Sequence, residues 1–177
     1  FEDPKSPVSE AYRSLRTSLI YSKSKSNTGS VILVSSPGPG EGKTTTIVNL
    51  AITYANLGMK TLLIDCDLRK PVTHKIFSLD RDVGLTKFIT GYSTEIDEII
   101  NKTEVKNLEI ITCGIVPPNP SEILASSRME NVMGQLKEKY DIILIDSPPL
   151  LAVTDTFVLT KFSDQFILVI RAGKTEK

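Results

Sequence analysis

The sequence predicts a doubly wound α/β domain, in which helices cover both faces of a mostly parallel sheet. Strand-like apolar runs alternate with helical segments along the chain. Two of these runs, "TLLID" and "DIILID", are unbroken, which is typical of strands that are buried on both faces. The 177 residues are 40% apolar and 24% charged, as expected for one globular domain with a substantial core.

Each element follows from its local pattern. We expect strands at residues 31–35, 61–65, 108–112, 141–146 and 165–170, and helices at residues 43–56, 121–139 and 154–162. A further helix is expected at residues 9–21, and the polar stretch "SKSKSNTGS" would connect it to the sheet as a flexible linker. We therefore divide the chain into an N-terminal linker and helix, residues 1–29, and an α/β domain, residues 30–177.

Both ends of the sequence indicate a piece of a longer protein. The first residues, "FEDPKSP", resemble a linker, and the last apolar run is followed only by "RAGKTEK". We therefore expect that the α/β domain is truncated at its C-terminus.

Charge and cysteine content exclude several classes of partner. The 21 basic and 21 acidic side chains cancel, so no net field attracts nucleic acid or anionic lipid. The two cysteines lie far apart and no signal peptide precedes them, which favours the reducing cytoplasm. No apolar run is long enough to cross a bilayer, so a link to the membrane would require a partner or further chain.

The stretch "SSPGPGEGKTTT", residues 35–46, has the composition of a phosphate-binding loop between a strand and a helix. Backbone N–H groups of such a loop point at phosphate oxygens, and the following helix adds its positive end. Lys43 would reach the outer phosphates, and the Thr44 hydroxyl would bind Mg²⁺. Pro37 stands where the strict pattern has its first glycine. The alternative is an ordinary turn with a capping glycine, which has no use for the sequence Gly-Lys-Thr.

Two carboxylate motifs support the nucleotide site. "LLIDCDLRKP" places Asp65 at the end of a buried strand and Asp67 two residues later, and "IILIDSPP" ends a second strand in Asp146. Either aspartate motif alone could be structural, but both follow a Lys-Thr loop. Carboxylates at these strand ends can hold Mg²⁺ against nucleotide phosphates. The sequence therefore predicts binding of Mg-ATP or Mg-GTP.

The loop and the two motifs together resemble the Walker A, A' and B motifs of the bacterial tyrosine kinases that regulate capsule and exopolysaccharide assembly. The similarity extends through "SEAYRSLRTSL", "GLTKFITG", "CGIVPPNPSEIL" and "SPPLLAVTD". It implies a P-loop NTPase fold, ATP as phosphate donor, Mg²⁺ as cofactor and autophosphorylation on tyrosine. It also implies a transmembrane activator, separate or fused upstream, a cognate tyrosine phosphatase, and a cytoplasmic position at the inner face of the plasma membrane.

The resemblance also implies roles for individual residues. Lys43 and the loop amides would hold the phosphates, Thr44 would bind Mg²⁺ directly, and Asp67 and Asp146 would complete the metal environment. Either Asp65 or Asp67 would accept the proton of the tyrosine hydroxyl, and the sequence does not choose between them. The full set expected to bind ATP is Gly38, Pro39, Gly40, Glu41, Gly42, Lys43, Thr44, Thr45 and Arg69.

The stretch "EAYRSLR" places Glu10, Arg13 and Arg16 on one face of a helix. One interpretation is a local ion pair on a solvated helix. In the family that the sequence resembles, this helix packs against the next subunit and builds a ring, so we expect an oligomer interface here.

The sequence departs from that family in its tyrosines. The family carries acceptor tyrosines in a C-terminal cluster, whereas the last tyrosine here is Tyr140. The acceptor tail is therefore either outside this sequence or absent from the protein.

The rival interpretation is an ATPase switch resembling the division-site and chromosome-partitioning ATPases, which cycle between dimer and monomer. Those proteins place a second lysine five positions before the invariant one, where this sequence has Gly38.

We assign no catalytic or metal-binding role to His74, Cys66 or Cys113. His74 is expected on the surface of a short helix, and Cys113 is expected in the core. Cys66 lies beside aspartates that raise its pKa.

Overall fold

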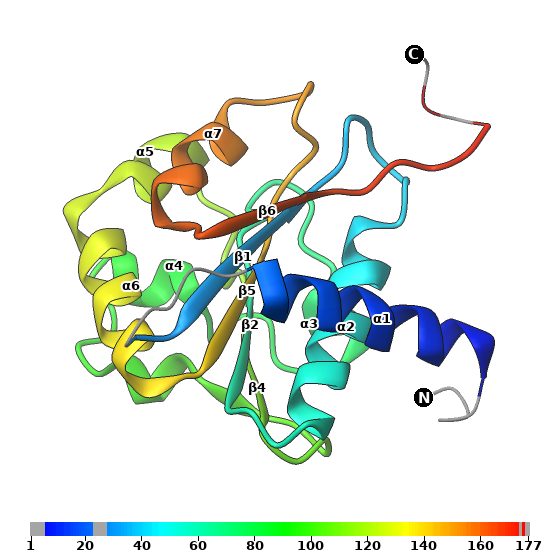
Figure 1. Cartoon of the computed structure of the whole chain (residues 1–177). Coiled ribbons are helices and arrows are strands. Elements are labelled where there is room, and N and C mark those ends of the chain that lie inside the picture. The colour runs from blue at the N-terminus through cyan, green and yellow to red at the C-terminus, as the bar shows by residue number, and fades with distance from the viewer. Residues whose placement is uncertain (1–5, 23–27, 174, 176–177) are drawn as a thin grey trace.

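The computed structural model describes residues 6–22, 28–173 and 175 (Figure 1). Most of the N-terminal stretch expected to be a linker and most of the polar connector lie outside the described residues. Within the described part of the chain, no helix is long and apolar enough to cross a membrane.

The described strands form one sheet in the order β3-β4-β2-β5-β1-β6. The strands are β1 (Ser30–Ser35), β2 (Thr61–Asp65), β3 (Asn101–Lys102), β4 (Leu108–Ile111), β5 (Ile142–Asp146) and β6 (Gln165–Leu168). All neighbouring pairs are parallel except β3 with β4, which is antiparallel. The predicted doubly wound, mostly parallel sheet is therefore confirmed.

Helices cover both faces of this sheet (Figure 1). They are α1 (Pro7–Ser22), α2 (Lys43–Asn56), α3 (Thr73–Ile76), α4 (Leu85–Ile89), α5 (Pro120–Ala125), α6 (Ser127–Lys139) and α7 (Asp155–Leu159), with 3₁₀ turns at Ile96–Ile99 and Thr160–Phe162. One buried cluster joins the sheet to α4, α5, α6 and α7, and a second joins it to α1 and α2.

Alternation along the strands divides the side chains between these two clusters. Val31 and Leu33 of β1 enter the cluster beneath α6, whereas Ile32 and Val34 enter the cluster beneath α2. All four are fully buried, and each such side chain stabilises the fold by roughly 1.5–3 kcal/mol. This two-sided burial explains why the strand sequence is apolar without interruption.

The predicted helix at residues 121–139 is wrong in one respect, because the structure has two helices there. Ser126 has an extended backbone, with φ −68° and ψ 154°, and its hydroxyl accepts a hydrogen bond from the Met129 N–H at 3.3 Å. Ser126 therefore ends α5 and caps α6. Ser121, at which the predicted helix starts, lies inside α5, which begins after Asn119 with Pro120 in its first turn.

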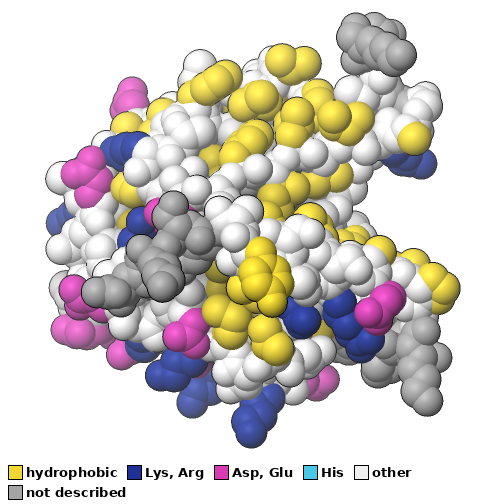
Figure 2. All heavy atoms as spheres, viewed as in Figure 1, with side chains coloured by type: hydrophobic (Ala, Val, Ile, Leu, Met, Phe, Trp, Pro, Cys, Tyr) yellow, Lys and Arg dark blue, Asp and Glu magenta, His cyan; other side chains and the backbone are white. Residues whose placement is uncertain are grey.

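Other boundaries differ by a few residues. The last strand ends at Leu168 rather than at residue 170, and the helix predicted at 154–162 finishes as a 3₁₀ turn. Figure 2 shows apolar side chains gathered over α7, β6 and the loop before α7, where Leu151, Phe157 and Phe166 are exposed.

Candidate active site

The candidate site lies where β1, β2 and β5 end at one edge of the sheet. The strand register pairs Asp146 of β5 with Asp65 of β2 on one side and with Val34 of β1 on the other. The glycine loop follows β1 directly, so the sheet brings the loop and both aspartate motifs together. Ligands of doubly wound domains bind at this edge.

The glycine loop turns through two left-handed residues. Gly40 has φ 73° and Gly42 has φ 97°, a region that residues with a Cβ rarely adopt, and α2 begins at Lys43. The loop after β5 contacts the first residues of the glycine loop, because the Leu150 N–H donates to the Ser36 carbonyl at 2.8 Å. The Leu151 N–H donates to the carbonyl of Pro37, the residue that departs from the strict motif, at 3.3 Å.

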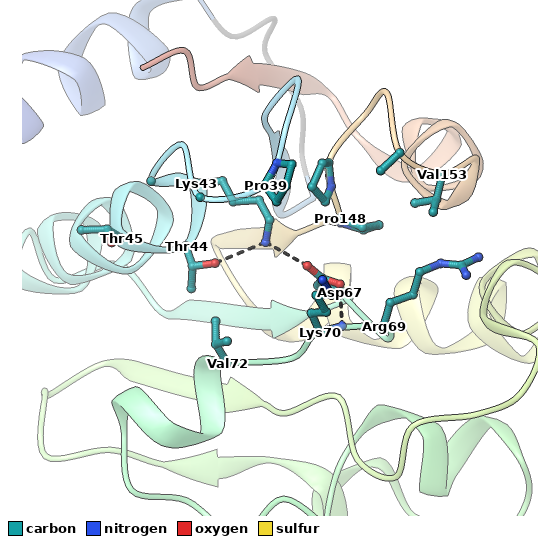
Figure 3. Close-up of a pocket in the computed structure, with 14 residues that line it drawn as sticks. Pro39, Lys43, Thr44, Thr45, Asp67, Arg69, Lys70, Val72, Pro148 and Val153 are labelled. Atoms are coloured by element: carbon teal, nitrogen blue, oxygen red, sulfur yellow. Dashed lines mark hydrogen bonds and ion pairs between the residues drawn. The ribbon is translucent and has the colours of Figure 1, made fainter. Parts of the chain in front are cut away.

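The Lys43 ammonium lies between the carboxylates of Asp67 and Asp146, and Figure 3 shows its contact with Asp67. Its Nζ is 3.1 Å from Asp67 Oδ2 and 3.2 Å from Asp146 Oδ1, and the Thr44 hydroxyl donates to Asp146 Oδ2 at 2.7 Å. Burial alone would lower the pKa of Lys43, but the charges and hydrogen bonds of Asp146 and Asp67 raise it above its ordinary value. The ammonium therefore stays charged at the centre of the site.

Asp65 and Asp67 have different environments. Asp65 is fully buried, and its carboxylate accepts hydrogen bonds from the backbone N–H groups of Asp67 at 3.2 Å and Thr73 at 3.1 Å. Burial, and then the negative charge of Asp146, raises the pKa of Asp65 to about 7. Asp67 instead lines the cavity, and its carboxylate accepts from the Lys70 N–H at 3.0 Å and contacts the Lys43 ammonium at 3.1 Å. Asp65 shapes the loop after β2, and Asp67 faces the space in which a substrate would bind.

Arg69 turns toward α7 at the cavity rim (Figure 3). Its Nε and Nη2 donate to the carboxylate of Asp155 at 2.8 and 3.1 Å, and the Ser121 hydroxyl donates to the same carboxylate. Burial opposes the charge of Asp155, but the hydrogen bonds from Arg69 and Ser121 lower its pKa overall. The sequence pattern alone indicates no role for Asp155. Its only local signal is an aspartate at a helix start, which is also a common capping residue.

The cavity beside Lys43 has a volume of about 470 Å³, within the usual range for small-molecule sites. Of the residues expected to bind ATP, Pro39, Gly40, Gly42, Lys43, Thr44, Thr45 and Arg69 line it. Its apolar wall, which no sequence motif indicates, consists of Val72, Pro148, Pro149, Ala152 and Val153. Gly38 and Glu41 do not line the cavity, because the Glu41 carboxylate turns back to accept a hydrogen bond from the Gly38 N–H at 2.7 Å.

The oxygen atoms at the site fit Mg²⁺ together with a nucleotide. The described residues contain no group of three or more His, Cys, Asp or Glu side chains that could hold a metal alone. Mg²⁺ typically uses one or two carboxylates, with phosphates and waters completing its octahedron. Thr44, Asp67 and Asp146 offer such a partial set.

The three residues expected at an oligomer interface make contacts within the chain. Arg13 forms an ion pair with Glu10 at 2.7 Å, and Arg16 donates to the Thr53 carbonyl of α2 at 2.7 Å. Both Glu10 and Arg13 are exposed at their side chains. Their contact with another subunit stays a prediction.

The cysteines and the histidine lie outside this constellation. Cys66 and Cys113 are fully buried. Burial raises the pKa of the Cys66 thiol well above its ordinary value and that of Cys113 to about 12, so neither is a nucleophile. His74 lies on α3 as expected, but it is half-buried rather than on the open surface.

A glycine loop between strand and helix, a Lys-Thr pair at the helix start and aspartates at two strand ends define a P-loop nucleotide-binding protein. The model of the AAA domain family matches residues 29–175. The tyrosine-protein kinase YwqD of Bacillus subtilis strain 168 is 42% identical over 99% of this chain and 73% of its own length. The chain therefore belongs to the AAA domain family and to the bacterial tyrosine-protein kinases.

Solved structures agree with this assignment. The chimerical protein CapA2B2 matches 99% of this chain and 76% of its own at a TM-score of 0.93 and 36% identity. The kinase domain of the Escherichia coli tyrosine kinase ETK matches 97% of this chain and 67% of its own at a TM-score of 0.92 and 33% identity. This chain is thus a tyrosine-kinase domain.

The rival family of ATPase switches is more distant. The septum site-determining protein MinD of Pyrococcus horikoshii, complexed with Mg-ADP, matches 80% of this chain and 57% of its own at a TM-score of 0.66 and 27% identity. It shares the P-loop fold, but the kinases match nearly the whole chain at higher identity. The predicted kinase is confirmed over the switch. Some kinase relatives are much longer than this chain, which spans 22% of the length of the tyrosine-protein kinase ptk of Acinetobacter johnsonii.

Proposed function

We propose that this chain transfers the γ-phosphate of Mg-ATP to tyrosine side chains, as the catalytic domain of an autokinase in exopolysaccharide or capsule assembly. The observation that carries the proposal is the position of the Lys43 ammonium between Asp67 and Asp146, at the mouth of the glycine loop. Phosphoryl transfer depends on positioning and charge neutralisation, and this cluster supplies both.

In this proposal the residues of the loop hold the nucleotide. The amides of residues 40–44 point at the phosphates, and Lys43 exchanges part of its contact with the two carboxylates for the β- and γ-phosphate oxygens. Bound Mg²⁺ would neutralise charge on those oxygens, and Thr44, Asp67 and Asp146 would hold it directly or through waters.

We assign the base to Asp67, because Asp67 lines the cavity and its carboxylate contacts the Lys43 ammonium, whereas Asp65 does not line the cavity and its carboxylate is held by two backbone N–H groups. Asp67 accepts the proton of the tyrosine hydroxyl as the phenolic oxygen bonds to the γ-phosphorus. The bond from that phosphorus to the bridging oxygen breaks, and its electron pair leaves with ADP. Atoms and charge balance without a further reactant.

The acceptor is a tyrosine of a C-terminal tail, offered by a neighbouring subunit of a ring. In the described part of the chain, Tyr54 and Tyr140 are buried in the core, which removes them as acceptors. The family resemblance supports the ring through Glu10, Arg13 and Arg16. It also supports a transmembrane activator, separate or fused upstream, a cognate tyrosine phosphatase, a position at the inner face of the plasma membrane, and no role in binding nucleic acid.

The test is a phosphotyrosine assay on the complete gene product with Mg-ATP and its activator segment. We expect phosphotyrosine in the wild type and a loss of about 100-fold or more in Lys43→Met and Asp67→Asn. Glu138→Gln, an exposed carboxylate on α6, is the matched control and should keep wild-type activity. Equal phosphotyrosine in the Asp67 variant would overturn the assigned roles.

A further inference from the structure

Glu41 stands between the two left-handed glycines of the phosphate loop, yet its carboxylate faces away from the cavity. The residue is only 8% exposed. Its Oε1 accepts a hydrogen bond from the Gly38 N–H at 2.7 Å, which closes the first part of the loop. Its Oε2 accepts from the backbone N–H of Arg171 at 3.2 Å and from the Thr175 hydroxyl. One side chain therefore joins the glycine loop to chain that lies 130 residues further on.

The second partner is the chain that leaves the edge strand β6. The Val169 N–H still donates to Ser35 of β1, at 2.8 Å, as in the sheet. Two residues later the Arg171 N–H donates to Glu41 instead, and the Thr175 N–H donates back to the Arg171 carbonyl at 3.2 Å. Figure 1 shows this chain passing the loop before α2. Glu41 thus replaces the sheet as the partner of the departing chain.

A buried carboxylate is stable only when its charge is compensated by hydrogen bonds, and such charge-assisted bonds are among the stronger ones in proteins. Removal of any of these donors would leave part of the Glu41 charge unsatisfied. The space around the bond is also restricted, because a Cβ at residue 38 would lie 3.1 Å from Glu41 Oε1. The Glu41 carboxylate therefore fits against residue 38 because glycine has no side chain there.

We propose that Glu41 is a positioning residue that couples the phosphate loop to Arg171 and Thr175, so that the loop and these two residues hold each other in the binding conformation. The coupling rests on the proposed function, in which the loop binds the phosphates of ATP. Because coupling between two parts of one protein is reciprocal, ATP bound at the loop should also stabilise the segment after β6. Glu41 acts on the nucleotide through the loop backbone and is not itself a phosphate ligand.

Three substitutions separate the contributions. Glu41→Gln keeps the length and one acceptor oxygen for the Gly38 N–H, but it loses the charge and the acceptor for the Arg171 N–H. Glu41→Asp keeps the charge, but its shorter side chain cannot reach the same donors. Thr175→Val removes one donor at nearly constant volume, at a half-buried position. Glu138→Gln again serves as the matched control.

The first measurement is nucleotide affinity and kinetics in the complete gene product, with a fluorescent ATP analogue and with ATP. We expect Glu41→Gln and Glu41→Asp to weaken nucleotide binding about tenfold, since each loses a charge-assisted bond, and Thr175→Val about threefold. In the Glu41 variants, the fold increase in the KM for ATP should be at least five times the fold decrease in kcat. The double variant of Glu41→Gln with Thr175→Val should equal Glu41→Gln alone, because the hydroxyl acts through the same carboxylate.

The second measurement is hydrogen exchange at the Arg171 amide with and without saturating Mg-ADP. Nucleotide should slow this exchange in the wild type and fail to slow it in Glu41→Gln, which a purely structural role would not produce. Unchanged affinity in the Glu41 variants, or an Arg171 amide insensitive to nucleotide in the wild type, would overturn the coupling alone. A wild type that binds no nucleotide would overturn the proposed function as well.

Discussion

The guanidinium of Arg69 makes two hydrogen bonds to the fully buried carboxylate of Asp155, at 2.8 and 3.1 Å. This pair fixes the loop after β2, which carries Asp67, to the start of α7. The loop after β5 ends at the same helix, so one ion pair anchors two of the segments that line the cavity. Arg69 therefore contributes to the site through Asp155, in addition to any contact with nucleotide.

Substitution of Asp155 by Asn should destabilise the protein and weaken catalysis. The change leaves Arg69 with a neutral partner and should lower the free energy of unfolding by about 1–3 kcal/mol. We expect phosphotyrosine formation to fall through kcat, because Asp67 loses its anchor. Urea unfolding and steady-state kinetics check both effects. Wild-type stability together with wild-type kcat would show that the ion pair does not position the loop.

The Asp155 pair should also contribute to acid sensitivity. The folded-state pKa of Asp155 is lower than its ordinary value of 3.8. A carboxyl with a lowered pKa contributes stability that is present above the ordinary value and lost as the pH falls through the folded value. The difference in unfolding free energy between wild type and Asp155→Asn should therefore shrink below about pH 4. A difference that stays constant down to pH 2.5 would contradict this assignment.

Asp65 should give the opposite pH dependence. Its folded pKa of about 7 lies above the ordinary value of 3.8, so the folded state binds the proton more tightly than the unfolded state. Between these two values the stability conferred by protonated Asp65 falls as the pH rises. The free energy of unfolding, measured in urea at pH 5 and at pH 7.5, should decline less between these two pH values in Asp65→Asn than in the wild type. An equal decline in both proteins would argue against a raised pKa.

The two aspartates of the motif after β2 should separate kinetically. Asp67→Asn removes the proposed base and should lower kcat by roughly 10²–10⁴-fold at near-normal stability. Asp65→Asn keeps an acceptor for one backbone N–H and should change stability more than it changes kcat. Measurement of kcat together with the unfolding midpoint for each variant tests the assignment. A larger loss of kcat in Asp65→Asn would reverse the two roles.

The break between α5 and α6 predicts a local effect on stability. Ser126→Ala removes the oxygen that accepts from the Met129 N–H and should lower the free energy of unfolding by about 1 kcal/mol. Ser121→Ala removes instead a donor to Asp155 and should also affect the site. Thermal unfolding and phosphotyrosine assays should therefore show a change in activity for Ser121→Ala alone. Equal losses of activity in Ser126→Ala and Ser121→Ala would contradict the separate roles of the two serines.

The sequence predicted the parts of the fold that depend on local pattern. The strands β1, β2 and β5 were found because two-sided burial makes them apolar without a break, and α2 because the glycine loop marks its start. The helix break at Ser126 was missed, because apolar residues at helical spacing continue across it. The short β3 was also missed, since two residues show no periodicity.

Within the site, the sequence located the loop and the aspartates, because strand ends of a parallel sheet meet at one edge. It could not choose between Asp65 and Asp67, since both follow the same strand and only their hydrogen bonds distinguish them. Arg69 pairs with Asp155, 86 residues away, and Glu41 pairs with Arg171, 130 residues away, so neither pair leaves a local signal in the sequence. Such tertiary pairs required the structure.

The measurement that tests the account most directly is the fate of the γ-phosphate in a single turnover. The complete gene product, saturated with γ-labelled Mg-ATP, would be quenched and the label divided between phosphotyrosine and inorganic phosphate. We predict that label appears on tyrosine at the rate at which ATP is consumed, and that Asp67→Asn abolishes this transfer. Consumption of ATP with all label in inorganic phosphate, accompanied by nucleotide-dependent dimerisation, would contradict the kinase mechanism.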